Sequence, residues 1–446
     1  MMITVFFLIV FVFIIVQYII NPTKGIFIYI LLSLFFPYIT LFSVVFRFEL
    51  LIVPFLLIIT LIKKKKDLVI PVIFIVWFVF VIYCGIVSFF SVPFVGSSSV
   101  NFIEFYNYLR FGGLILIGAN ADFSNEGLYK LNRFFFFLSV PIALLALGLA
   151  AGNSLASSIT QNFYTSPSRP VFDNQMAFID IGYSFRSIGV FENVSYYASY
   201  ILVILSLGLS FVLNKQLNNK SVKAQLIITG VILLNLIAGI SASSLTFYVG
   251  ALFIISYFFV KRPLLSIKLI SGMLIIATVI GAFFYTQIIN SIQQYLDVFQ
   301  YLYQSFLGGD KLTERYSLAG REYGDLTQII QSKWLLGNGF RYYDKIVVND
   351  SLYLEFFYQA GLIGTLILVM FIGLMFFNTI KKRAIKAHRI YLIFLIILIT
   401  GIGCNSISIV RMSEWLWIIM GITVTAKFKA QDTPYLQNIT NNDYSH

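Results

Sequence analysis

Charged residues, cysteine and histidine are all scarce in this sequence. Asp, Glu, Lys and Arg make up only 11% of the 446 residues, whereas a soluble domain usually carries about 25%. Both cysteines, Cys84 and Cys404, lie in apolar runs, which excludes a disulfide framework and a thiolate metal site. The only histidines are His388, inside a basic cluster, and His446. A Ser-His-Asp triad, a histidine zinc site and a histidine proton relay are therefore not expected.

Long apolar runs are abundant in this sequence, in contrast to charged residues. Hydrophobic residue types make up 59% of the chain, and the mean hydropathy is +0.88. Runs of helical length predict membrane-crossing helices, because a barrel would show short alternating segments instead. The predicted fold class is an all-α integral membrane protein, a bundle of about 12–14 transmembrane helices. The expected crossings are 3–20, 26–46, 50–62, 68–90, 104–120, 134–152, 194–213, 224–240, 243–260, 269–286, 351–380, 390–405 and 412–426.

The basic residues predict an orientation for these helices. Lysine and arginine clusters such as Lys63 to Lys66 and Lys381 to Arg389 fall in alternate loops. The positive-inside rule then puts the N-terminus outside and the C-terminus inside. The formal net charge of +12 therefore reflects topology and contact with anionic inner-leaflet lipid, and it does not indicate a nucleic-acid partner.

This topology divides the chain into six parts. Transmembrane helices occupy 1–152, 194–286 and 351–426, and the polar stretch 427–446 is expected to be a disordered cytoplasmic tail. Two long outer segments, 153–193 and 287–350, lie between them. The second contains two stretches of helical periodicity before the sequence Gly337-Asn338-Gly339, so we expect it to form a partly helical outer loop domain.

Arginine is concentrated on the predicted outer side, whereas the inner loops favour lysine. The planar fork of arginine suits phosphate and carboxylate groups. The outer arginines could therefore pair with outer acidic side chains, or together hold an anionic ligand, and we favour the second interpretation for the group. They are Arg47, Arg110, Arg169, Arg186, Arg315, Arg321, Arg341 and Arg411.

The predicted crossings carry few ionisable residues near their middles. Ion-coupled carriers usually need such residues there, so a transporter is less favoured. Glu355, about one turn inside the crossing 351–380, is the nearest exception.

A series of motifs in the second half of the chain resembles a known family. In order they are Arg186-x-x-Gly189-x-Phe191-x-Asn193, Ser241-Ala242-Ser243-Ser244, Gly320-Arg321, Trp334-Leu335-Leu336-Gly337-Asn338-Gly339-Phe340, Asn349-Asp350-Ser351 and Gly361-Leu362-Ile363-Gly364. In order, spacing and predicted outward placement, this series is similar to the O-antigen polymerase and O-antigen ligase superfamily of bacterial envelopes. The resemblance covers about residues 180 to 425 in motif order.

The region around Asp350 separates the two branches of this superfamily. The ligase branch carries a histidine, a polar residue, nine residues, a glycine, two residues and a small residue. Asp350-Ser351, Gly361 and Gly364 fit that frame, but aspartate stands where the ligases have histidine. This departure favours the polymerase branch.

The resemblance implies a glycosyltransferase that joins lipid-linked oligosaccharide repeat units on the outer, periplasmic face of the bacterial inner membrane. The donor is a polyprenyl pyrophosphate-linked chain, and the acceptor is a sugar hydroxyl of a second unit. Such chemistry needs a base at the hydroxyl and cations at the departing pyrophosphate. Asp350 is the candidate base, although it could equally cap the following helix. Arg186, Arg321, Arg341 and Glu192 are candidates for substrate binding, and no metal or cofactor is expected.

Two other activities remain open beside the polymerase. One is the ligase that moves finished glycan onto a lipid core, and the other is a flippase for lipid-linked oligosaccharide. The resemblance implies membrane lipid, a chain-length regulator and a flippase as partners of a polymerase.

Overall fold

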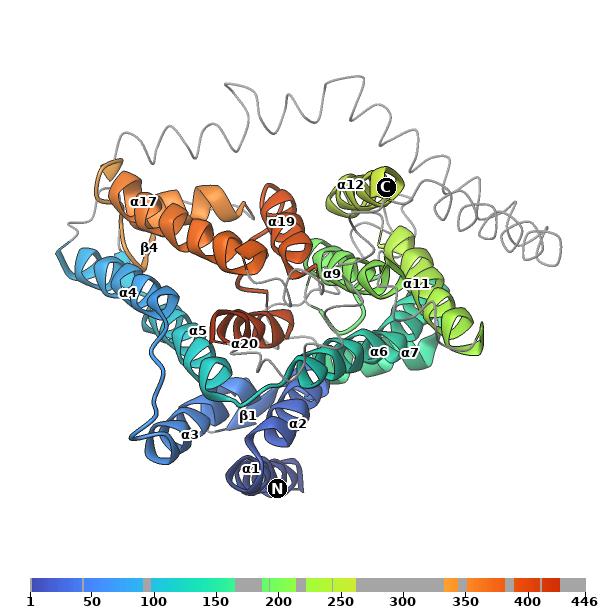
Figure 1. The fold of residues 1–446 in the computed structure, drawn as a ribbon, viewed down its shortest axis with the longest axis horizontal. Coiled ribbons are helices and arrows are strands. Elements are labelled where there is room, and N and C mark those ends of the chain that lie inside the picture. The colour runs from blue at the N-terminus through green and yellow to red at the C-terminus, as the bar shows by residue number, and fades with distance from the viewer. Residues whose placement is uncertain are drawn as a thin grey trace. The chain divides into compact units, whose positions relative to one another are not determined.

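The computed structural model describes residues 2–41, 44–90, 98–164, 187–191, 193–213, 222–242, 244–261, 333–343, 351–381, 389–409 and 411–425. Helices dominate these residues, and the strands are two pairs of three residues each (Figure 1). Five helices are long and apolar enough to cross a membrane, namely Val72–Phe90, Asn125–Ala150, Val194–Leu213, Ala224–Ser241 and Leu352–Lys381. The chain is thus an α-helical membrane protein. The expected crossing 269–286, the tail 427–446 and most of the outer segment 287–350 lie outside the described residues.

The chain divides into two compact units, and the boundary falls within one helix, α6 (Asn125–Ala150). The first unit comprises Met1–Leu138, Asn214–Asn219 and Ile329–His446. Its elements before α6 are α1 (Met2–Ile20), α2 (Pro22–Phe35), β1 (Ile39–Leu41), β2 (Val44–Phe46), α3 (Phe48–Lys63), α4 (Val72–Phe90), β3 (Ser98–Val100) and α5 (Phe102–Asn120). Its later elements are β4 (Arg341–Tyr343), α17 (Leu352–Lys381), α19 (Ile390–Thr400) and α20 (Met412–Thr425).

The second unit comprises Ser139–Leu213 and Lys220–Gln328. After α6 it contains α7 (Ser154–Ile159), the π-helix η1 (Thr160–Tyr164), α9 (Val194–Leu213), α11 (Val222–Ser241) and α12 (Leu245–Lys261). Helix α9 packs against both α11 and α12 (Figure 1), and nearly all of its side chains are buried.

Helix α5 forms the centre of the first unit because it packs against α3, α4 and α20 (Figure 1). It meets α20 closely, since a Cβ atom on Gly118 or Gly421 would collide with the backbone of the other helix. Small residues of this kind let helices approach in an apolar environment, where dispersion drives their packing. Beside this contact, the ring of Trp417 stacks on Phe111 at 5.0 Å and lies 4.4 Å from Trp77.

The expected crossing 26–46 is wrong in its second half. Helix α2 begins at an Asn21 cap whose side chain accepts a hydrogen bond from the Lys24 amide at 3.0 Å, and it ends at Phe35. Phe36 is already extended, because Pro37 disfavours helical backbone in the residue before it. The chain then forms the antiparallel β1–β2 pair, so the apolar run continues without continuing the helix.

Candidate functional site

One of the five predicted site residues, Arg341, lies within the described part of the chain. Arg186, Glu192, Arg321 and Asp350 lie outside it. The candidate site is therefore built around Arg341.

Arg341 is held by a strand and a helix that are both distant from it in sequence. It opens β4, which pairs antiparallel with β3 so that Arg341 lies opposite Val100. Its Nε donates a hydrogen bond to the carbonyl of Ser88, at the end of α4, at 2.6 Å. The Ser88 hydroxyl accepts a hydrogen bond from the neighbouring Phe340 amide, also at 2.6 Å. One buried serine thereby orients both the guanidinium of Arg341 and the backbone of Phe340 just before it.

The segment before Arg341 packs on a break in α17. Gly361 has φ 57° and ψ −162° inside this helix, which interrupts its ladder of backbone hydrogen bonds. The turn Gly337-Asn338-Gly339, which we call the glycine turn, donates hydrogen bonds to the carbonyls of α17 just before this break. Its Asn338 amide donates to the Tyr358 carbonyl at 2.9 Å and its Gly339 amide to the Gln359 carbonyl at 2.7 Å.

The contact between the glycine turn and α17 is reciprocal and leaves no room for side chains. The Leu362 amide donates to the Trp334 carbonyl at 2.8 Å. A Cβ atom on Gly337 would lie 2.5 Å from the Gly361 nitrogen, and one on Gly361 would lie 2.7 Å from the Leu335 carbonyl oxygen. Two of the motifs singled out in the sequence, 334–340 and 361–364, are therefore one packed structure.

Positive charge gathers at this end of the first unit. Lys333 begins the described segment that leads to Arg341. Partial burial lowers the pKa of its ammonium, and the nearby positive charge of Arg341 lowers this pKa further. Lowering by a like charge is expected where two cations share one surface, so an anion bound there would relieve their repulsion.

Two carboxylates lie close to the same place, and one of them escaped the sequence analysis. The Gln359 side-chain amide donates hydrogen bonds to Glu104 of α5 and, at 3.4 Å, to Glu355 of α17. Asn405 donates to the other Glu355 oxygen at 2.6 Å. The sequence pattern Asn101-x-x-Glu104 predicts only a helix cap. The structure contains this cap, because the Asn101 side chain accepts a hydrogen bond from the Glu104 amide at 3.1 Å.

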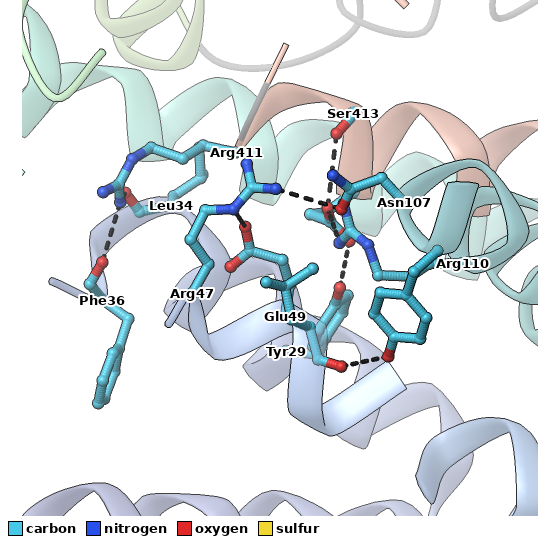
Figure 2. A network of polar contacts seen from close by, with 12 residues as sticks. Tyr29, Leu34, Phe36, Arg47, Glu49, Asn107, Arg110, Arg411 and Ser413 are labelled. Carbon is cyan, nitrogen blue, oxygen red and sulfur yellow. Dashed lines mark hydrogen bonds and ion pairs between the residues drawn. The ribbon is translucent and has the colours of Figure 1, made fainter. Parts of the chain in front are cut away.

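A second polar network surrounds α5 and includes three of the outer arginines (Figure 2). Arg47 reaches Glu49 at 3.6 Å and donates to Asn107 at 3.2 Å. Arg110, midway along α5, forms a buried ion pair with Glu414 of α20. The Tyr29 hydroxyl also donates to Glu414.

The third arginine of this network has a structural partner of another kind. Arg411 donates to the backbone carbonyls of Leu34 and Phe36 at 2.8 and 3.0 Å. These buried carbonyls lie at the C-terminal end of α2, where a cation interacts favourably with the helix dipole. Arg47 and Arg110 thus follow the simpler interpretation, because both pair with acidic side chains.

In the second unit, the residues after Arg186 are firmly anchored. The Ser187 hydroxyl lies 2.7 Å from that of Ser241, and Gly189 adopts φ 57°. Phe191 is buried against Tyr197 and Tyr200. The motif that begins at Arg186 therefore contacts the serine motif that begins at Ser241, although they are far apart in the chain.

Comparison with known proteins finds no matching family model, no similar curated protein and no similar solved structure. The resemblance to the O-antigen polymerase and ligase superfamily therefore stays a prediction from the motifs.

Proposed function

We propose that this protein is a polysaccharide polymerase that joins lipid-linked oligosaccharide repeat units, as the motif series suggests. It works on the outer face of a bacterial inner membrane, which it crosses many times. The product is O-antigen or a similar surface polysaccharide. The observation that best supports the proposal is the arrangement around Arg341, where a serine of α4 orients the guanidinium beside two of the family-like motifs.

The reaction transfers a growing glycan from its pyrophosphate carrier to a new unit. A sugar hydroxyl of the acceptor attacks the anomeric carbon of the donor, and the bond from that carbon to the pyrophosphate oxygen breaks. The hydroxyl proton passes to a base, for which Asp350 is the candidate. The polyprenyl pyrophosphate leaves with the bonding electron pair, and its added negative charge is the charge that the enzyme must stabilise.

Arginines are well suited to that task without a metal. A guanidinium can hold two phosphate oxygens at once, and it stays charged at any relevant pH. In this proposal Arg341 contacts the pyrophosphate together with Arg186 and Arg321. The orientation of Arg341 by Ser88 before substrate arrives lowers the cost of ordering it on binding.

Two alternative functions each have a specific observation in their favour. The ligase shares the frame around Asp350, and it differs in the acceptor. A flippase is favoured by the buried Arg110–Glu414 pair inside the bundle, because intramembrane charges often mark a transport path. However, this pair is neutral overall and is contacted by Tyr29 as well, which also suits a purely structural role.

One experiment separates the three activities. In a strain that lacks the gene, surface glycan is resolved by size on a gel. Loss of a polymerase leaves single repeat units on the lipid core, and re-expression of the protein restores the ladder. Core without any repeat would instead identify a ligase, and repeat units stranded inside the cell would identify a flippase.

A further inference from the structure

Oxygen atoms converge where α5, α17 and the loop after α19 meet. Glu104 comes from the first turn of α5, and Glu355 from the first turn of α17. Gln359 bridges the two carboxylates through its amide nitrogen. Asn405, from the loop 401–409, contacts Glu355 on the other side. Two acidic groups are thus brought together in a largely buried place.

Glu104 gains no cationic partner there among the described residues. Its carboxylate accepts hydrogen bonds from the side-chain amides of Asn101 and Gln359, and none of the ion pairs found in the described part of the chain includes it. Neutral donors compensate only part of the cost of removing a carboxylate from water. A buried carboxylate therefore calls for a positive charge or a proton.

A second and independent observation concerns neutral oxygens at the same place. The side chains of Gln359 and Asn405 are 4% and 3% exposed, yet their amide oxygens have no hydrogen-bond partner in the described structure. The Tyr108 side chain, 2% exposed, lies beside Asn405 and within electrostatic reach of both carboxylates. Its hydroxyl interacts with the Asn405 side chain, which leaves the buried amide oxygen of Gln359 as the clearest unsatisfied atom among the described residues of the cluster. Buried polar atoms are rarely left in this state.

These oxygens form a suitable ligand set for a hard cation. An amide side chain exchanges its nitrogen for its oxygen by a half turn, so Gln359 and Asn405 can present oxygen to an ion that lies between the carboxylates. The described residues contain no group of three or more Asp, Glu, His or Cys side chains for a metal. Any ion here would therefore depend on two carboxylates and on neutral oxygens.

We propose that Glu104, Glu355, Gln359, Asn405 and Tyr108 bind a calcium ion. Calcium accepts six to eight oxygen ligands in irregular geometry, including amide and carboxylate oxygens, whereas magnesium demands a near-ideal octahedron and keeps several waters. The ion joins α5, α17 and the loop 401–409, and it neutralises the charge that the two carboxylates bring. The proposal does not depend on the polymerase activity.

The test uses the full-length protein purified in detergent and treated with a chelator. Added Ca²⁺ should raise its unfolding temperature at concentrations where Mg²⁺ has little effect. The variant Glu104→Gln keeps the shape of the side chain and removes one charge. It should weaken Ca²⁺ binding, measured by calorimetry, about ten-fold or more, because affinity follows the charge of the ligands. The control is Glu126→Gln, which alters an exposed carboxylate paired with Lys130 and should bind Ca²⁺ as the parent does.

A second variant tests the proposal even if the Glu104→Gln protein fails to fold. Asn405→Asp adds a third carboxylate to the cluster. If the cluster binds calcium, this variant is less stable than the parent in chelator and recovers when Ca²⁺ is added. The proposal would be overturned if Ca²⁺ did not change the unfolding temperature of the parent, or if only Mg²⁺ changed it. An equal Ca²⁺ response in the parent and in Glu104→Gln would also overturn it. Absence of any cation response would assign a shared proton to the two carboxylates instead.

Discussion

The outer arginines share a residue type and a predicted side of the membrane, yet their partners differ. The guanidinium of Arg110 is buried against Glu414, and that of Arg411 contacts backbone carbonyls of α2. Arg341 is tied through its Nε to one carbonyl of α4. Residue type alone could not separate these roles, because the partners lie up to 377 positions away in the sequence.

The buried ion pair leads to the first prediction at this scale. Glu414→Gln removes one charge and leaves the Arg110 guanidinium without its counter-charge in the interior. Breaking a buried pair on one side costs about 3–5 kcal/mol, so the variant should unfold at a clearly lower temperature in detergent. Glu126→Gln is the matched control, since it breaks an exposed pair with Lys130 that contributes little. Equal unfolding temperatures for the two variants would show that Glu414 does not compensate Arg110.

The second prediction concerns the geometry of Arg341. Arg341→Lys keeps the positive charge, but lysine has neither an Nε donor for the Ser88 carbonyl nor a fork for two phosphate oxygens. The loss of a charge-assisted contact of about 1.5–3 kcal/mol should slow chain extension about ten- to a hundred-fold. The readout is the length of the polymer ladder at matched protein levels.

Lys381→Gln, at the far end of α17, is the control and should leave the ladder unchanged. The same lysine substitution at Arg186 and Arg321 tests the rest of the proposed phosphate contacts. A normal ladder in all three lysine variants would reject the phosphate role of the outer arginines.

At the scale of elements, the apolar runs predicted most helices well, because length and hydropathy alone decide whether a run can be helical in a membrane. The expected run 194–213 coincides with α9, and 412–426 closely matches α20. The hairpin after α2 was missed because its strands are as apolar as a helix. The break at Gly361 was missed for another reason, since it depends on backbone partners in the glycine turn.

Only part of the candidate site could be predicted from the sequence. Arg341 and the motifs around it were found from residue type and order in the chain. Ser88, Glu104 and Gln359 were not, because each acts through a neighbour more than 250 positions away. A single sequence contains no record of such contacts. Asp350, Arg186, Glu192 and Arg321 remain predictions.

The contact between the glycine turn and α17 gives the third prediction. Gly361→Ala places a side chain on a backbone conformation that is essentially restricted to glycine, which costs on the order of 1–3 kcal/mol. The new Cβ would also collide with the glycine turn. Thermal unfolding should reveal the loss, and chain extension should fall because Arg341 follows the turn directly.

Gly373→Ala provides the control within the same helix. No atom lies within 4 Å of a Cβ placed there, so alanine should be neutral or should stabilise the helix by up to about 1 kcal/mol. If the two variants behave alike, the break at Gly361 has no structural importance.

At the scale of the whole molecule, charge and length together predict an orientation. The positive-inside rule places the cluster Lys381 to Arg389 in the cytoplasm and residues 310–345 outside. Helix α17 connects these regions. Its 30 residues extend about 45 Å at 1.5 Å per residue, which exceeds the hydrocarbon core of about 30 Å even with the break at Gly361. Its two ends should therefore lie on opposite sides of the membrane.

Reporter fusions on either side of α17 test this orientation, which the proposed chemistry requires. A reporter inserted after Lys386 should be active in the cytoplasm, and one placed within residues 310–345 should be active outside. If both reporters were on the same side of the membrane, α17 would not cross the membrane. Reversal of both would put Arg341 on the cytoplasmic side, where its contact with an exported lipid-linked donor is impossible, and would remove the polymerase proposal together with the topology. The expected pattern leaves Arg341 and Lys333 at the outer end of the bundle, where a pyrophosphate carrier could meet them.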